Sequence, residues 1–400
     1  MTEQIVPPFS TQRDRRCPFD PAPATAQADG PVSPVGLWNG KTAWLVTGYD
    51  EQRSVLSDNR LSVDTRKDGY PHLSRIGEMR RKGLRPFVFM DNPEHDRHRR
   101  MVTANFMVRR VEALRPRIQQ IVDERIDALL AGPRPVDLVA EFGLPVPSLV
   151  ICELLGVPYE DHPLFQSCSR RMALAATPAE AFEPMGELRG YLTDLLERKE
   201  AHPGDDVISR LVTDQVRTGA LTREEAVDMC LVLLVAGHET TANMISLGTL
   251  ALLENPAALA ELQENQDASF VANAVEELLR YLSITHTGLL RVATEPVEVA
   301  GVRIAPGEGV IAANNVGNRD AGAFPDPDRL DLHRAARHHL AFGYGIHQCL
   351  GQPLARAELQ VVYSTLYRRI PGLRLAIPFE DVPFKFEENI YGVTSLPVAW

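Results

Sequence analysis

The sequence has little of what disulfide-stapled, zinc-binding or membrane-spanning proteins contain. Its five cysteines are scattered, with no Cys-x-x-Cys pair, which excludes a disulfide framework and a zinc site built from cysteine pairs. No segment approaches the roughly 20 apolar residues of a spanning helix, and no secretory core stands near the N-terminus. Unpaired cysteines fit a reducing compartment, so we expect a cytoplasmic protein with no membrane partner.

An excess of positive charge is also absent. The chain carries 42 Lys and Arg side chains against 53 Asp and Glu, a formal net charge of −11. Such a surface repels a phosphate backbone, so no nucleic acid is expected as a partner. The exception is the stretch 75–117, with 12 basic and 5 acidic side chains, which is either a local basic face or scattered solvated charge.

What is present is an ordinary globular composition over 400 residues, 44% hydrophobic and 24% charged. A chain of this length buries roughly three quarters of its unfolded surface, enough to enclose a cofactor. Seven prolines in residues 1–40 predict an irregular N-terminal arm or cap. Helical periodicity from about 93 to 264, a strand at 43–46, hairpins within 297–313 and a β pair within 389–398 predict a mainly α (α+β) fold.

The longest predicted helix begins after Thr222 and ends at Leu253, before Asn255-Pro256. Thr222 and Glu225 have the spacing of a capping box. At 1.5 Å per residue the helix spans about 46 Å, enough to cross the whole domain. The polar segment 236–241, Ala-Gly-His-Glu-Thr-Thr, interrupts its apolar middle. Polar groups at the centre of a buried helix indicate a functional site.

The strongest motif is the segment 342–351, Phe-Gly-Tyr-Gly-Ile-His-Gln-Cys-Leu-Gly, followed by Pro353 and a helical run. The glycines let the backbone pass closely against a flat partner, and Pro353 suits a first helical turn. Cys349 is therefore expected at a helix N-terminus, which favours the metal-binding thiolate. One sulfur cannot build a four-ligand zinc site, but it can supply the axial bond of haem iron. The other interpretation is a buried structural cysteine.

This motif and the segment 236–241 resemble those of the cytochrome P-450 superfamily, in its soluble bacterial, actinomycete-type members. The resemblance implies the P-450 fold, a large helical bundle with a long central helix across the haem and small antiparallel sheets. It implies one haem-thiolate monooxygenase domain over residues 1–400, with Cys349 as the iron ligand of haem b. It also implies O2 as co-substrate and NAD(P)H electrons delivered by ferredoxin reductase and ferredoxin, to whose docking surface the stretch 75–117 could contribute.

The resemblance assigns further residues. Glu239 and Thr240 would be the acid and alcohol of a proton relay. Haem contacts would come from Ala236, Phe342, Gly343 and Gly351, and propionate partners would be His95, Arg99, Arg291 and His347. A structural ion cluster would join Glu277, Arg280 and Arg329, although the i, i+3 spacing of the first two is common on any surface helix.

The residues that would line a substrate pocket in such a protein are apolar. They are Phe87, Val88, Phe89, Val232, Val235, Leu289, Leu290, Ile390 and Tyr391. Each of them could equally belong to the core. We expect an apolar small-molecule substrate, such as a polyketide, macrolide, terpenoid or steroid-like compound, that is hydroxylated or epoxidised. Two alternatives stay open: a peroxide-driven haem-thiolate peroxygenase and a non-catalytic haem-binding sensor.

Overall fold

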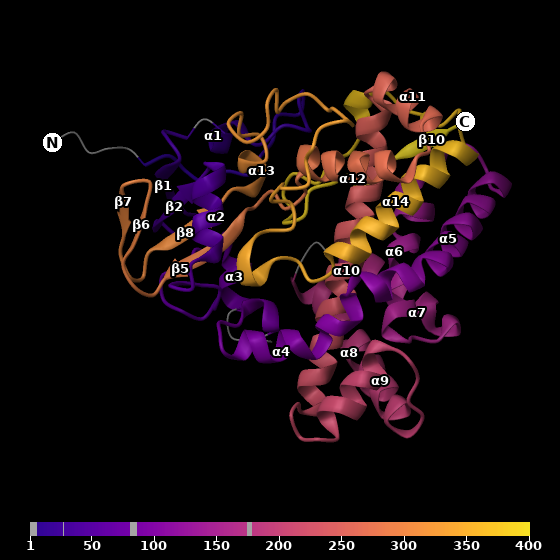
Figure 1. Ribbon diagram of the computed structural model, residues 1–400, viewed down its shortest axis with the longest axis horizontal. Coiled ribbons are helices and arrows are strands. Elements are labelled where there is room, and N and C mark those ends of the chain that lie inside the picture. The colour runs from indigo at the N-terminus through magenta and orange to yellow at the C-terminus, as the bar shows by residue number, and fades with distance from the viewer. Residues whose placement is uncertain (1–5, 27, 81–85, 174–177) are drawn as a thin grey trace.

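The computed structural model describes residues 6–26, 28–80, 86–173 and 178–400. Figure 1 shows a helical half, crossed by α10, beside a smaller half that contains most of the strands. The N-terminal strands lie in one sheet with strands from residues 289–312. The expected mainly helical α+β fold is therefore confirmed.

Ten helices of nine residues or more contain most of the helical residues in the described chain. They are α2 (Tyr49–Ser57), α4 (Glu94–Thr103), α5 (Val108–Ala131), α6 (Pro145–Leu155), α7 (His162–Ala173), α8 (Pro178–Ala201), α10 (Arg223–Leu253), α11 (Pro256–Glu264), α12 (Ala268–Leu282) and α14 (Gln352–Arg369). The shorter ones are α1 (Pro23–Ala26), α3 (Arg75–Arg80), α9 (Val207–Arg210) and α13 (Asn314–Gly317).

Helix α10 is buried along most of its length. It begins with the predicted capping box, since the Thr222 hydroxyl accepts the Glu225 N–H at 3.1 Å and the Glu225 carboxylate accepts the Thr222 N–H at 2.8 Å. By length and composition α10 could cross a membrane, yet 67% of its apolar window is buried inside the protein. It packs against α6, α8 and α14, and is a core helix.

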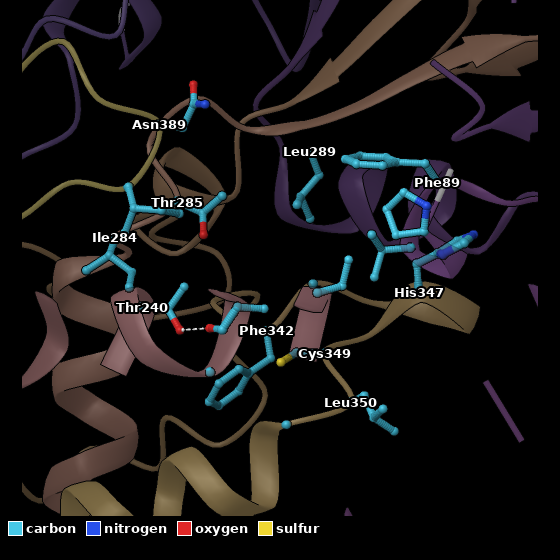
Figure 2. Close-up of a pocket in the computed structure, with 18 of the residues that line it drawn as sticks. Phe89, Thr240, Ile284, Thr285, Leu289, Phe342, His347, Cys349, Leu350 and Asn389 are labelled. Carbon is cyan, nitrogen blue, oxygen red and sulfur yellow. Dashed lines mark hydrogen bonds between the residues drawn. The ribbon is translucent and has the colours of Figure 1, made fainter. Parts of the chain in front are cut away.

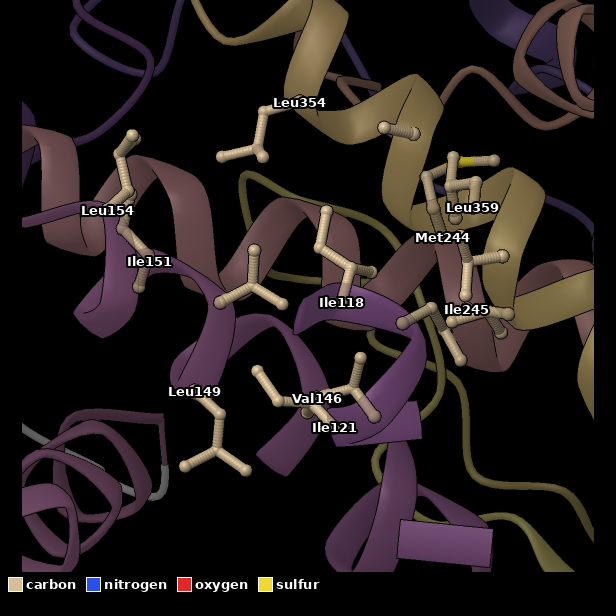
Figure 3. Packing of buried hydrophobic residues seen from close by; sticks show 14 of the residues in the cluster. Ile118, Ile121, Val146, Leu149, Ile151, Leu154, Met244, Ile245, Leu354 and Leu359 are labelled. Carbon is tan, nitrogen blue, oxygen red and sulfur yellow. The ribbon is translucent and has the colours of Figure 1, made fainter. Parts of the chain in front are cut away.

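Apolar side chains from four helices meet around the middle of α10 (Figure 3). They include Ile118 and Ile121 of α5, Val146 and Leu149 of α6, Met244 and Ile245 of α10, and Leu354 and Leu359 of α14. Burial of this surface, at roughly 25 cal/mol per Å², stabilises the position of α10. Gly237 adds to the fit, because a Cβ atom there would lie 3.0 Å from the Ile151 side chain. The polar turn of α10 is therefore held tightly against α6.

The five-stranded sheet has the order β1-β2-β8-β5-β3. Its strands are β1 (Val32–Gly36), β2 (Thr42–Val46), β3 (Leu61–Ser62), β5 (Leu289–Ala293) and β8 (Gly309–Ala312). The prediction of an irregular arm is wrong for residues 32–36, where Pro34 pairs with Trp44 in an antiparallel ladder. Proline is tolerated because β1 is an edge strand, whose outer side needs no backbone donor.

The later strands follow the prediction only in part. β6 (Val297–Val299) and β7 (Val302–Ile304) form the expected hairpin around Ala300 and Gly301, which both have positive φ. β8, however, pairs parallel with β2 and antiparallel with β5. The β pair predicted within 389–398 is wrong, because β10 (Pro397–Ala399) pairs with β4 (Val136–Asp137) and β9 (Arg374–Leu375). Periodicity marks a strand, but distant segments supply its partner.

The N-terminal arm is anchored by the buried side chain of Arg13. Its guanidinium donates to the carbonyl oxygens of Leu282 and Ser283, at 3.2 and 3.1 Å, where α12 ends. The same group lies 4.0 Å from the centre of the Tyr391 ring. These contacts hold the arm against α12 and the C-terminal segment.

A buried ion cluster connects α12 to the segment 318–334. Glu277 and Arg280 have no exposed side-chain surface and form a bidentate pair at 2.7 and 2.8 Å. Arg334 adds a second cation, with its Nε 3.1 Å from Glu277 Oε1. The N–H of Asp331 also donates to Glu277 at 3.0 Å. Every oxygen of the buried carboxylate is thereby satisfied.

The assignment of Arg329 to this cluster is wrong. Its side chain is 69% exposed and pairs with Asp331 at the surface. Only its carbonyl oxygen faces the cluster, where it accepts hydrogen bonds from Arg280 and Arg334. The Arg334 guanidinium also donates to the carbonyl oxygens of Pro325 and Asp326, which hold it against the cluster.

Arg334→Ala should lower the free energy of unfolding by about 3 kcal/mol, because it leaves the Glu277 charge incompletely paired in the interior. Arg329→Ala is the matched control and should change stability by less than about 1 kcal/mol, since it removes a surface pair. Denaturant unfolding of both variants measures the difference. Equal losses would contradict the assignment of Arg334.

Candidate active site

A cavity of about 920 Å³ lies between α10, the start of β5 and the segment that precedes α14. Its walls are mainly apolar, with contributions from residues 86–89 and 389–390. Figure 2 shows the Cys349 sulfur beside Phe342, with Thr240 on the neighbouring part of α10. The segments that meet here come from across the sequence, and the two strongest motifs of the sequence share this one cavity.

The loop that presents Cys349 is built by its glycines. Gly343 and Gly345 have φ of 69° and 74°, which side chains rarely adopt. At Gly345 a Cβ atom would also collide with the backbone carbonyl of Leu56. The Cys349 N–H donates to the Phe342 carbonyl at 2.8 Å, which closes the loop, and Gly351 caps α14. The sulfur is thus held at a helix N-terminus, as predicted.

The Cys349 side chain lines the cavity and is exposed to it. Burial raises the pKa of its thiol, while the amides of Gly351 and Gln352 and the charge of Arg99 oppose that rise. The amides at the start of α14 therefore favour the thiolate, as expected, but burial outweighs their effect on the pKa. A coordinating cation deprotonates a thiol outright, so a bound metal would supply the remaining stabilisation.

Four donor side chains line one edge of the cavity without an acidic partner. His95, Arg99, Arg291 and His347 all contact the cavity, and the His95 and His347 rings lie 4.0 Å apart between centroids. Arg99 donates to the Gln348 carbonyl at 2.6 Å, and Arg291 to the Leu290 carbonyl at 2.9 Å. Among the described residues, no carboxylate lies within ion-pair distance of either arginine.

Burial lowers the pKa values of the four basic side chains at this edge. It lowers the pKa of Arg291 to about 10, that of His95 to about 4 and that of His347 to about 3. Both ring nitrogens of His95 are buried without a hydrogen-bond partner. A buried cation without a counter-charge is costly, so this edge is complementary to an anionic ligand. The two carboxylates of a porphyrin fit that requirement, and Cys349 fits its metal.

Residues of the central turn of α10 face the same cavity. Ala236, Gly237, Thr240 and Thr241 belong to its wall. The Thr240 hydroxyl donates to the Ala236 carbonyl at 2.7 Å, the dashed line in Figure 2. This bond takes up a carbonyl of the helix ladder and leaves the hydroxyl oxygen able to accept from the cavity.

Glu239, by contrast, is not part of the cavity wall. Its carboxylate lies 4.0 Å from the ammonium group of Lys385. Burial raises the pKa of Glu239, Lys385 lowers it and Glu388 raises it. The structure therefore places Glu239 behind Thr240, on the side of the C-terminal segment.

The structure brings most of the other predicted residues together at the cavity. Its wall includes Phe342, Gly343 and Gly351 near Cys349, and the apolar residues Phe87, Val88, Phe89, Val232, Leu289, Leu290 and Ile390. Leu233, Phe182 and Met185 also line it and were missed by sequence reasoning. No motif marks Phe182 and Met185, because α8 meets the cavity only through tertiary packing.

Two predicted pocket residues lie elsewhere. Tyr391 is fully buried, stacks on Phe384 at 6.0 Å and lies beneath Arg13. It follows Ile390, which lines the cavity at the end of a bend over residues 388–390. Val235 packs against the hydrophobic core, because its position on α10 is rotated away from the face that Val232 shares with Ala236.

The basic stretch 75–117 carries mixed charge. Arg81, Lys82 and Arg85 lie outside the described residues. Among the described residues of the stretch, ion pairs join Arg100 to Asp96, Arg110 to Asp205, Arg115 to Glu112 and Arg117 to Glu153. The described residues of this stretch therefore carry scattered, solvated charges of both signs and do not form an unbroken basic face.

Glu358 on α14 is a further cavity residue that no motif indicated. Its side chain is buried, and Oε2 has no hydrogen-bond partner. Burial raises the pKa of Glu358 well above its ordinary value. We therefore expect a protonated carboxylic acid in the wall, since an unpaired charge there would be costly.

Comparisons with known proteins agree with this geometry. A family model described as Cytochrome P450 matches residues 185–397. Cytochrome P450 GfsF of Streptomyces halstedii is 50% identical over 99% of this chain and 96% of its own length. Its crystal structure superimposes with a TM-score of 0.95 over 99% of this chain and 100% of that one, at 49% identity.

Two further relatives carry names that state a compound. Pentalenic acid synthase of Streptomyces avermitilis is 48% identical, with both chains fully covered. A crystal structure of CYP105P1 in complex with filipin I has a TM-score of 0.91 and 44% identity, covering 99% of each chain.

Glu358 offers a test of the cavity's electrostatics. Because its pKa is raised by folding, stability falls as the pH rises from the unfolded pKa of glutamate, about 4.3, toward the folded value. Glu358→Gln removes this loss, because the amide does not ionise. The substitution should therefore raise the free energy of unfolding more at pH 8 than at pH 5, and we expect the two effects to differ by about 1–3 kcal/mol. Denaturant unfolding at both pH values measures it. The exposed Glu264→Gln is the control, and a pH-independent effect of Glu358→Gln would contradict the argument.

Proposed function

The chain belongs to the cytochrome P450 family, and from that membership we propose that it is a ferredoxin-dependent enzyme that hydroxylates or epoxidises an apolar natural product. As a P450 monooxygenase it uses haem and O2, with electrons that originate from NAD(P)H and reach it through redox partners. We also infer that residues 1–400 form one oxygenase domain, which the full-length coverage by relatives supports. A cytoplasmic location is part of the same proposal.

The observation that carries the proposal is one sulfur atom in a cavity whose edge holds unpaired cations. Cys349 would bind the haem iron, and His95, Arg99, Arg291 and His347 would bind the propionates. When bound, the haem supplies the activation of O2 and the insertion of one oxygen atom into a C–H or C=C bond. The role of the surrounding chain is to hold this group in a dry, mainly apolar cavity.

Thr240 and Glu239 would move protons into that cavity. The Thr240 hydroxyl lies in the wall, where it can accept a proton and donate it onward, directly or through water. Glu239, the residue before it, would supply the proton from behind the wall. A raised pKa makes Glu239 a better reservoir for a proton near neutral pH.

The substrate class follows from the wall above these residues. Phe87, Val88, Phe89, Leu289 and Ile390 offer apolar surface, and polar groups are few. Burial of apolar area would hold the substrate, which disfavours small anions. The similarity to a pentalenic acid synthase and to a protein crystallised with filipin I supports a polyketide, macrolide, terpenoid or steroid-like compound. Thr285, Thr287 and Asn389 could orient it by hydrogen bonds.

Cys349→Ser should abolish the carbon monoxide difference band of a thiolate-bound haem, because a hydroxyl cannot replace the thiolate ligand. The matched control is Cys17→Ser, which changes an exposed cysteine away from the cavity and should keep the band. The measurement is the absorption spectrum of the reduced, carbon monoxide-treated protein. An intact band in Cys349→Ser would refute the ligand assignment.

Reconstitution tests the reaction. With ferredoxin, ferredoxin reductase and NAD(P)H, the enzyme should add one atom of isotopically labelled O2 to an apolar natural product, and that compound should shift the haem iron to high spin on binding. Small anions should cause no shift. Turnover with hydrogen peroxide alone, at a rate equal to that with ferredoxin, would identify a peroxygenase instead, and the absence of any turnover would favour a sensor.

A further inference from the structure

Glu239 faces a second, outer set of charges that the cavity does not contain. Lys385 Nζ lies 4.0 Å from Glu239 Oε1 and 3.4 Å from Glu388 Oε2. The Lys385 side chain is only 9% exposed, whereas both carboxylates are more than a third exposed. One buried ammonium group thus lies between two acids that are exposed to a similar extent, Glu239 on α10 beside the cavity wall and Glu388 on the C-terminal segment.

The segment that carries Lys385 is clamped to α10 beside Glu239. The Lys385 N–H donates to the Gly392 carbonyl at 2.9 Å, and Thr394 N–H donates to Pro383 at 2.8 Å, which closes a loop over residues 385–392. Gly392 lies so near the Asn243 side chain that a Cβ atom there would collide with it. Asn243 in turn donates to the Glu239 carbonyl at 2.9 Å. These contacts hold the backbone of Lys385 where its side chain reaches both acids.

Among the residues that the structure describes, two charges have the largest effect on the pKa of Glu239. They are Lys385 and Glu388, both on this loop. His238, its neighbour on α10, is buried on the other side, and burial lowers the pKa of His238 to about 4, which leaves it neutral near pH 7. Because Lys385 stabilises the ionised form of Glu239, and Glu388 the protonated form, the position of one ammonium group sets which form Glu239 adopts.

We propose that Lys385 is a positioning residue for proton uptake, which pairs in turn with Glu239 and Glu388 and so lets Glu239 load a proton from solvent and release it toward Thr240. This inference rests on the proposed Glu239 and Thr240 relay. When Lys385 pairs with Glu388, a proton from bulk water binds a Glu239 carboxylate oxygen. When Lys385 returns to Glu239, the proton leaves for the Thr240 hydroxyl or a water beside it. No electron moves in either step.

Infrared difference spectroscopy tests the electrostatic part without turnover. The carboxylic acid band that is lost in Glu239→Gln reports Glu239, and its pH titration gives the protonation of that residue in the resting enzyme. Lys385→Met should move this titration to higher pH, Lys385→Arg should restore it, and Glu388→Gln should move it to lower pH. An unchanged titration in Lys385→Met would overturn the proposal.

Turnover then tests the role in proton uptake. Lys385→Met leaves Glu239 holding its proton more tightly, so product formation per NAD(P)H should fall by about tenfold at pH 7, with an unchanged KM and an alkaline-shifted pH profile. Lys385→Arg should recover most of the coupling. A shifted infrared titration with normal coupling, or lower thermal stability with an unchanged pH profile, would overturn the proposal.

The Thr240→Ala variant separates this inference from the function on which it rests. Without the hydroxyl, electrons should be diverted to hydrogen peroxide, whereas Thr240→Ser should stay coupled. If Thr240→Ala is fully coupled, the Glu239 and Thr240 relay itself is wrong. If Thr240→Ala uncouples and Lys385→Met does not, the relay stands and only the role of Lys385 is refuted.

Discussion

The molecule is organised around a sulfur atom that must be buried and yet open to a cavity. Burial disfavours the anionic form of Cys349, so the surrounding backbone has to supply what water would otherwise give. Two glycines with positive φ, at 343 and 345, let the loop turn tightly enough to place the sulfur over the first amides of α14. Helix α10 closes the other side of the cavity, and its position depends on close packing against α6 and α14.

Arginine side chains away from solvent have two different kinds of partner in this protein. Arg280 and Arg334 share the carboxylate of Glu277, so that cluster is complete without a ligand. Arg99 and Arg291, at the edge of the cavity, donate to backbone carbonyls and have no carboxylate partner among the described residues. The first arrangement stabilises the fold behind the Cys349 loop. The second is complementary to the carboxylates of a bound porphyrin.

The geometry of α10 separates two neighbouring residues with different tasks. Successive residues are rotated by about 100° on a helix, so Thr240 faces the cavity while Glu239 faces the C-terminal loop. In the relay that we propose, protons and substrate would therefore reach the same centre by different routes. The apolar wall would exclude bulk water, whereas Glu239 lies beside the charges of Lys385 and Glu388, outside that wall.

Features that depend on residues close together in the sequence could be predicted from the sequence alone. Local backbone preferences predict the capping box at Thr222, the hairpin turn at Ala300-Gly301 and the glycine loop before Cys349. The mainly helical class and the two cavity motifs could also be identified from the sequence. Which arginine joins Glu277, which side of the 390–391 segment faces the cavity, and the approach of Lys385 to Glu239 did not follow. These depend on contacts between segments more than 50 residues apart, and such contacts form only when the whole chain packs into one core.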